Sequence, residues 1–319
     1  MSLSLGSLST YTKQLVKPLL TSAVTGAKTQ QLIMNGGIVI PGAKGAVAIP
    51  LIDTDAVFQT DACGYSPSGT TTFTQRTVTP GKIMISETIC PKDFEAYFTQ
   101  EALKAGSTYT DFGNAEFLKA YLDKKNARIA SQLETAIWQG DSTGATANTN
   151  KFDGLQKLIA AGSPVDANVS GYTGVATITT VTSSNVVAAT EGIYKAIPAQ
   201  VLAKGDVKIF VGMDWYRLLI LAYRALNLFS YNPQETMSTT FVLPGTSVEV
   251  VAVNGLNGTG DAYAISLSNM AMAVDLADEE TNYRVWYSED NDEIRTKVSF
   301  KLGVNVAFTN ECVKFVAAI

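Results

Sequence analysis

The longest helix that the sequence predicts follows from apolar residues that recur on one helical face. Between Asn114 and Trp138 these residues stand four or seven positions apart, and they comprise Leu118, Leu122, Ile129, Leu133 and Ile137. The other positions of the segment are rich in Lys, Arg, Asp and Glu. A long helix with a narrow apolar seam and a charged opposite side is suited to lying across a sheet.

A glycine-rich loop follows this spine helix. The helical pattern stops at Gly140 and Asp141, gives way to Gly, Thr and Asn residues, and resumes after Gly154. Glycine is the residue that allows a tight turn or a close backbone approach. We therefore predict a structural turn at Gly140, Asp141 and Gly154, where the spine helix delivers the chain into a second region.

Residues 41–90 predict an extended β-hairpin. Val47–Ile52 reads as one strand, and Thr70–Val78 is Thr-rich and β-prone. Pro80-Gly81 is a turn signal, and Lys82–Ser86 is the next strand. A long two-stranded projection is only marginally stable by itself. We therefore expect this extended loop to lie on something else.

The segments that flank these elements are less regular. Residues 1–40 read as an arm with one short helix near Lys13–Leu20, and Pro91 is suited to the first position of a further helix. Residues 141–185 are rich in Gly, Thr, Ser and Asn, with short β pieces such as Val175–Ile178. We interpret them as a loop plus hairpin that forms a crossover between domains.

Helix and strand patterns alternate over residues 185–268, which predicts an α/β subdomain. Its predicted elements are a helix with N-cap oxygens from Ser183–Asn185 and an end at Pro198, a strand Lys208–Val211, a helix capped by Asp214, and strands Val248–Val253 and Ala262–Leu267. Trp138 and Trp215 stand at helix ends, where packing in the core is the expected role.

From Met270 to the end the pattern is β. Tyr283–Tyr287 and Thr296–Leu302 flank an acidic turn at Ser288–Glu293, and two further strands follow, Val304–Phe308 and Cys312–Val316. Together these patterns predict an α+β fold.

Composition points toward buried contacts between subunits. Charged residues make up 17% of the 319 residues, against about 25% in typical globular domains, and interface cores are depleted in charge. The net charge is −5 and no Lys/Arg cluster occurs, which argues against a groove that grips phosphates. A mildly acidic protein can still surround nucleic acid without gripping it.

The residue inventory removes most catalytic chemistry. The chain has no histidine, which excludes Ser-His-Asp and Cys-His pairs and the commonest metal ligand. Its three cysteines, Cys63, Cys90 and Cys312, are odd in number and lack CxxC spacing, so we expect reduced thiols packed as small hydrophobes. The first residues do not form a secretory signal, and the apolar run at 218–222 is too short to span a bilayer. We expect synthesis in a cytoplasm.

Several acidic and glycine-rich clusters resemble ligand sites, and each has a simpler interpretation. Asp290, Asp292 and Glu293 lack the spacing of a calcium loop, so we interpret them as a soluble hairpin tip. Gly255, Gly258 and Gly260 have the wrong spacing for a dinucleotide loop and precede a strand. Glu279-Glu280 reads as a solvated loop, and the Asn257-Gly258-Thr259 sequon matters only in a secreted protein. We assign no catalytic, cofactor-binding or metal-binding residue.

The order of the elements resembles the major capsid proteins of tailed bacteriophages, the Hong Kong 97-type fold. The segments that carry the resemblance are 137–141 with 152–155, and Lys208–Val211 leading into the helix at 214–227. The likeness covers nearly the whole chain and rests on order and spacing, because no single motif is specific.

The resemblance implies an N-terminal arm at 1–40, an extended loop at 41–90, a peripheral domain with the spine helix and crossover at 91–184, an axial domain at 185–268, and C-terminal strands at 269–319 that return to both domains. It implies pentamers and hexamers of an icosahedral shell around phage double-stranded DNA, located in the virion and assembled in the bacterial cytoplasm. The arm and the extended loop would embrace neighbouring subunits.

The same resemblance implies partners. They are further copies of the chain, a portal, a scaffold, decoration proteins in some family members, and packaged DNA contacted without sequence specificity; no membrane is implied. The scaffold would be a separate protein, unless the sequence is a processed form from which a scaffolding segment has been cleaved. Some members also cross-link a loop lysine to an asparagine of a neighbour, and here Lys44 or Lys82 would face Asn282 or Asn291, although nothing in the sequence selects them.

Two other functions remain open from the sequence. An encapsulin-type nanocompartment shell would share the fold and enclose an enzyme cargo, and neighbouring genes would separate the two cases. A histidine-free enzyme that uses carboxylates would instead be a compact monomer with a deep acidic cleft.

Overall fold

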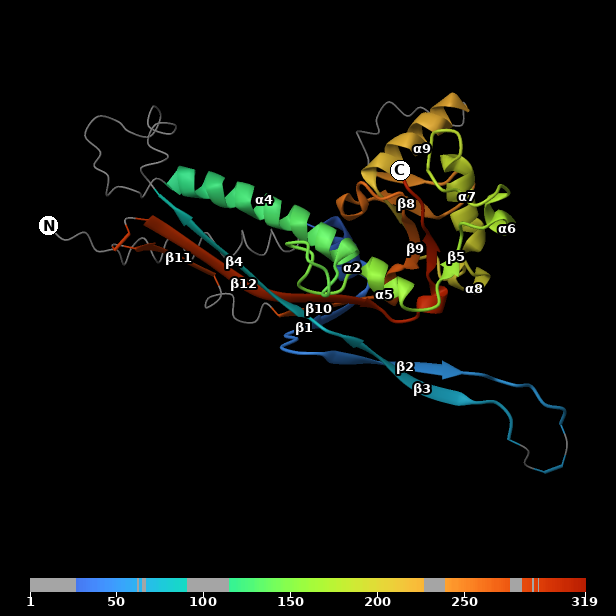
Figure 1. Cartoon of the computed structure of the whole chain (residues 1–319). Helices are drawn as coiled ribbons and strands as arrows, with labels where there is room; N and C mark the ends of the chain where they lie inside the picture. Colours follow the sequence, from blue (N-terminus) through green and yellow to red (C-terminus); the bar gives the residue numbers. More distant parts are fainter. Residues whose placement is uncertain are drawn as a thin grey trace.

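Two sheets and a projecting hairpin make up the architecture of the computed structural model (Figure 1). It describes residues 27–61, 63–64, 67–90, 115–226, 239–275, 283–288, 290–291 and 293–319. The predicted α+β fold class is confirmed, because these residues form helices together with sheets whose strands pair mainly in antiparallel fashion. The predicted helices near Lys13–Leu20 and after Pro91 lie outside the described residues.

The first sheet is long and is built around one strand of 14 residues, β12. Its strands are β1 (Ile38–Pro41), β4 (Gly81–Ile89), β10 (Met270–Asp275), β11 (Tyr283–Ser288) and β12 (Glu293–Val306). The acidic tip between β11 and β12 joins an antiparallel pair, as predicted. The two strands expected at 296–302 and 304–308 are one continuous strand, because Gly303 stays in the ladder opposite Ala273 and leaves room for the Pro80 backbone.

The spine helix lies along one face of this sheet, beside the long strands, as Figure 1 shows. It is α4 (Ala115–Gln139), within one residue of the prediction. Ile129, Leu133 and Ile137 of the predicted stripe are buried against Val298, Phe300 and Leu302 among others in one core. Two shorter helices, α2 (Lys28–Gly36) and α5 (Leu155–Ala160), complete this layer. Because α2 and β1 belong to the folded body, the arm predicted over 1–40 does not extend to residue 40.

The hairpin is shorter than the predicted 41–90 loop. It pairs β2 (Val47–Thr54) with β3 (Thr71–Val78) in antiparallel register, whereas β4 pairs along β12 in the long sheet. Alternate side chains of β4 explain its place in the long sheet, because Ile83 and Ile85 pack toward the core under α4. The base of the hairpin is also anchored, because Ile49 and Leu51 pack with Ala271 and Ala273 of β10.

The second sheet has six strands in the order β5-β13-β9-β6-β8-β7. They are β5 (Val165–Asp166), β6 (Val207–Val211), β7 (Thr240–Val242), β8 (Glu249–Ala252), β9 (Ala262–Ser266) and β13 (Val313–Phe315). Helices α6 (Ser170–Thr173), α7 (Val186–Ala196), α8 (Ala199–Leu202) and α9 (Met213–Ala225) accompany it. Two of its strands, β5 and β13, come from outside the predicted 185–268 unit, which sequence spacing alone did not indicate.

Three local predictions are wrong. Val175–Ile178 forms no strand, because the Asn168 side chain bonds both the amide (2.8 Å) and the carbonyl (2.8 Å) of Ile178. Asn185 precedes α7 without a side-chain cap, since its side chain instead bonds Thr180 and Thr182. The N-cap of α9 is Gly212, and Asp214 lies in the first turn.

Candidate functional site at the junction of the two sheets

The predicted turn at the end of α4 is a place where two backbone segments touch. The Gly140 amide donates to the Ala136 carbonyl (3.0 Å), and the Gly154 amide donates to the Gly140 carbonyl (2.8 Å). A Cβ on Gly140 would lie 2.5 Å from the Ala136 oxygen and 2.6 Å from the Phe152 oxygen. A Cβ on Gly154 would lie 2.5 Å from the Gly140 nitrogen. The structure therefore brings both predicted glycines together and leaves no space for a side chain at either.

An ionic cluster closes the same turn at the surface. Lys157 Nζ lies 2.6 Å from Asp141 Oδ1 and 2.7 Å from Asp153 Oδ1. The bond from Lys157 is the largest influence on Asp141 and, with bonds from Thr143, holds the pKa of that carboxyl well below its usual range. Burial acts to raise the pKa of Asp153, but bonds from Lys157 and Ser142 outweigh it and lower that pKa. Both carboxylates thus stay ionised and tie the ends of the loop to α5.

Trp138 anchors the end of α4 against the second sheet. Its ring is fully buried and lies 5.2 Å from the Phe210 ring and 5.7 Å from the Tyr263 ring, measured between centroids. Next to it, Gln139 Nε2 donates to the Gly255 carbonyl at 2.6 Å. Trp215 is also fully buried, with its ring edge-on to Phe315. The core role predicted for both tryptophans is confirmed.

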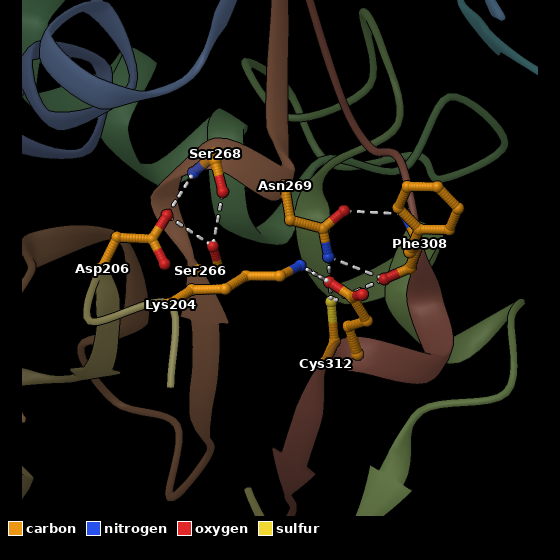
Figure 2. Close-up of polar contacts among 8 residues, drawn as sticks. Lys204, Asp206, Ser266, Ser268, Asn269, Phe308 and Cys312 are labelled. Atoms are coloured by element: carbon orange, nitrogen blue, oxygen red, sulfur yellow. Dashed lines mark hydrogen bonds and ion pairs between the residues drawn. The ribbon is translucent and has the colours of Figure 1, made fainter. Parts of the chain in front are cut away.

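Two further crossings between the sheets lie side by side and are joined by Asn269 (Figure 2). One is η2 (Leu267–Asn269) between β9 and β10, and the other is the segment with η3 (Thr309–Glu311) between β12 and β13. The Asn269 amide group donates to the Phe308 carbonyl (2.7 Å) and accepts from the Phe308 amide (2.7 Å). A side chain therefore continues the β10–β12 pairing beyond the end of the ladder.

Polar groups near Asn269 hold both crossings to the segment that precedes β6 (Figure 2). Asp206 Oδ2 accepts from the Ser266 hydroxyl (2.6 Å) and from the Ser268 amide (3.1 Å). Lys204 forms an ion pair with Glu311 at 2.7 Å. The junction is thus held at both crossings by directional bonds in addition to apolar packing.

Sequence reasoning found Gly140, Asp141 and Gly154 but missed Asn269 and Lys157. The position of Lys157, four residues after Asp153, was a readable signal for an ion pair on α5. Asn269 gave no signal, because its partner Phe308 lies 39 residues away in sequence.

The described residues were compared with the geometry of a metal site and of a membrane span. No group of three or more His, Cys, Asp or Glu side chains is placed to hold a metal ion among them. No helix in the same residues is long and apolar enough to cross a membrane. The predicted acidic tip is a turn in which Glu293 bonds Arg295 and Asn291, while Asp292, Glu279, Glu280 and Asn282 lie outside the described residues.

The cysteines differ from one another. All three are free thiols, but only Cys312 is buried as predicted. Cys63 is exposed near the tip of the hairpin and Cys90 is half-buried, so the expectation that all three pack as hydrophobes is wrong. Burial raises the pKa of Cys312 to about 12, which makes that thiol unreactive in the folded chain.

The distal hairpin carries large apolar side chains in water. The relative exposure is 100% for Phe58, 75% for Phe73, 59% for Ile52 and 51% for Val57. In Figure 1 this part of the chain projects away from both sheets. Apolar groups gathered on an exposed projection mark a contact surface.

Comparison by sequence identifies no relative, since neither a family model nor a curated protein matches the chain. Comparison by structure does find similar proteins. A chain of the satellite phage P4 procapsid, solved with its size determination (Sid) protein, is similar over 94% of this chain and 90% of its own, with a TM-score of 0.57 and 11% identity.

Two further solved structures agree with that likeness. A chain from Gordonia phage Cozz is similar over 90% of this chain and 86% of its own, with a TM-score of 0.54 and 12% identity. A chain from the capsid of the empty GTA particle is similar over 90% of this chain and 89% of its own, with a TM-score of 0.52 and 11% identity. The chain therefore has the fold of phage capsid proteins, and the fold predicted from the order of its elements is confirmed.

Proposed function

We propose that this chain is the major capsid protein of a tailed phage and builds an icosahedral shell of pentamers and hexamers around double-stranded DNA. The observation that carries the proposal is the likeness to a procapsid chain over nearly the full length of both. The long sheet with α4 would form the peripheral domain, and the six-stranded sheet would form the axial domain. The virion is the proposed location, with assembly in the host cytoplasm.

The exposed hairpin supports assembly with further copies. Between Lys44 and Arg76 the chain has no positive charge, and its largest apolar side chains there are in water. Burying apolar surface is worth about 25 cal/mol per Å², so covering Phe58 and Phe73 favours association. We propose that the hairpin lies on a neighbouring subunit, and that scaffolding, portal and decoration proteins complete the particle.

Electron microscopy of the purified full-length chain, with and without a co-expressed scaffold, tests the proposal. Shells, or rings of five or six subunits, are the expected result. A compact monomer at high concentration under both conditions would contradict it. The nucleic acid content of shells purified from infected cells separates a DNA capsid from a nanocompartment with enzyme cargo.

A pair of hairpin variants sharpens the test. Phe73→Ser removes an exposed aromatic ring, so we expect the unfolding free energy to change by less than about 0.5 kcal/mol while shell yield falls. Thr74→Ser, on the opposite face of the same strand, is the matched control and should assemble normally. Equal shell yields from both variants would exclude a contact through this face.

A further inference from the structure

A buried polar cluster lies where α2, α4 and the second sheet meet. Thr29, Glu134 and Trp138 are its centre, and all three are almost completely buried. The Thr29 hydroxyl donates to Glu134 Oε1 at 2.5 Å and accepts from Trp138 Nε1 at 2.8 Å. One threonine therefore connects an acidic and an aromatic side chain that stand on successive turns of α4.

The same carboxylate caps a helix to which it does not belong. Ala27, at the N-cap of α2, provides no side-chain bond. Glu134 of α4 takes that role, because its two oxygens lie 3.2 and 3.1 Å from the Thr29 amide. A negative charge at a helix N-terminus satisfies free amides and interacts favourably with the helix dipole. The beginning of α2 is thus held by the spine helix.

The cluster also reaches the second sheet. Lys28, next to Thr29, donates from Nζ to the Ala252 carbonyl (3.1 Å) and to the Thr239 carbonyl (3.0 Å) and hydroxyl (2.7 Å). The ring of Trp138 stacks on aromatic rings of that sheet. At Gly255 the fit is close, because a Cβ there would lie 2.4 Å from the backbone carbonyl oxygen of Glu134 and 2.4 Å from Trp138 Cδ1.

Such a cluster is a costly way to fill a core. Burial raises the pKa of Glu134 despite the bonds from Thr29 and lowers the pKa of Lys28, so desolvation opposes both charges. Apolar side chains of similar volume often give equal or greater stability. Directional bonds instead admit one relative position of the elements that carry them. The expected benefit of the cluster is therefore positional.

We propose that Thr29, Glu134 and Trp138 form a latch that fixes α2, α4 and the second sheet in the one relative position that shell assembly requires. The proposal rests on the proposed capsid function for its last step. The latch acts on the shape of the subunit. It joins α2, which leads into β1 of the long sheet, to α4, which ends at the second sheet. Lys28 completes it from the α2 side.

The chain contains a matched control for this latch. Thr190 is also fully buried and also bonds a tryptophan, Trp215 Nε1, at 3.3 Å. That pair lies between α7 and α9, inside the core of one domain. Thr29→Val and Thr190→Val therefore each deprive one indole of a buried partner, but only the first cuts a connection between the three units.

The experiment compares the two variants in the full chain by hydrogen exchange and by electron microscopy. In Thr29→Val we expect exchange of the α2 amides to rise roughly tenfold and residues 252–256 to lose protection with them, because the hydroxyl that holds the capping carboxylate of Glu134 in place and accepts from Trp138 is lost. Thr190→Val should leave both regions unchanged. Under conditions where both variants are folded, Thr29→Val should give few or irregular shells, and Thr190→Val should give regular ones.

Two outcomes would overturn the latch. One is regular shells from Thr29→Val in the yield obtained from Thr190→Val, and the other is unchanged exchange in α2 and at 252–256. Glu134→Met is the second probe, because it removes both oxygens that accept from the Thr29 amide and hydroxyl, so it should behave as Thr29→Val does. If the wild type forms no shells, the capsid proposal fails, but the exchange comparison still decides whether the latch exists.

Discussion

Gly140 gives the most direct test of the junction, because its replacement by alanine adds a single methyl group. That carbon would meet two backbone oxygens, of Ala136 at 2.5 Å and of Phe152 at 2.6 Å. Neither atom belongs to a flexible side chain that can move aside. The end of α4 or the segment at Phe152 must therefore shift, and the backbone bonds at both ends of the turn must lengthen.

The magnitude follows from the two effects. Overpacking in a close-packed site costs about 1–3 kcal/mol, and each of the two backbone hydrogen bonds at Gly140 contributes about 1 kcal/mol. Gly140→Ala should therefore lower the unfolding free energy by about 3–5 kcal/mol. For a chain of this size that corresponds to a fall in melting temperature of roughly 10 °C. Gly154→Ala should behave alike, because its Cβ would lie 2.5 Å from the Gly140 nitrogen.

Thermal and chemical unfolding of the unassembled subunit, followed by circular dichroism, measures the change. Gly171→Ala is the control, because this glycine lies in α6 and a Cβ there meets no atom within 4 Å. It should be neutral or slightly stabilising. The β-branched variants Gly140→Val and Gly154→Val should in addition impair shell assembly. Unfolding of Gly140→Ala within about 0.5 kcal/mol of wild type, or regular shells from the valine variants, would refute the assignment of this turn.

Three other expectations concern charge, the second crossing and the thiols. Asp141 and Asp153 both have lowered pKa values. Their ionised forms therefore stabilise the fold above the ordinary carboxyl pKa of about 3.9, and this stabilisation is lost as pH falls and the carboxylates become protonated. Lys157→Met should therefore reduce the loss of stability between about pH 5 and pH 3 in chemical denaturation. Asn269→Leu leaves the half-buried Phe308 amide without its partner and the Phe308 carbonyl with only the weak Cys312 thiol bond, and it should lower the unfolding free energy by about 2 kcal/mol, measured in the same assay. A thiol reagent should modify Cys63 in the folded subunit and Cys312 only after unfolding, as mass spectrometry would show.

Periodicity predicted the spine helix because α4 buries one stripe along a single sheet. Ile129, Leu133 and Ile137 recur every four residues, so local pattern and tertiary packing agree. The glycines of the turn were predicted for a similar reason, since the end of a helix is a local event. Strand β6 could be predicted because it is apolar on both faces and lies inside its sheet.

Sheet membership was harder to predict, because pairing partners are distant in sequence. β4 follows a turn signal and so resembled the continuation of the hairpin, but its partner β12 begins more than 200 residues later. β5 has two residues and pairs with β13 near the C-terminus, which no pattern over two positions can indicate. The same holds for Thr29 and Glu134, which lie 105 residues apart. Tertiary contacts decided all three cases.

The two kinds of surface in this chain imply a division between holding the subunit together and joining subunits. The junction uses directional contacts, namely the Asn269 bonds, the Lys157 ion pairs and the Thr29 cluster. The hairpin instead presents exposed apolar side chains, among them the paired Ile52 and Phe73, and the exposed Thr71, Thr72 and Thr74 beside them favour its solubility. In the proposed shell, a subunit whose shape is fixed at the junction would join its neighbours through the hairpin. Substitutions at the junction should therefore change particle shape and regularity, whereas substitutions of Phe58 or Phe73 should change the concentration at which particles form.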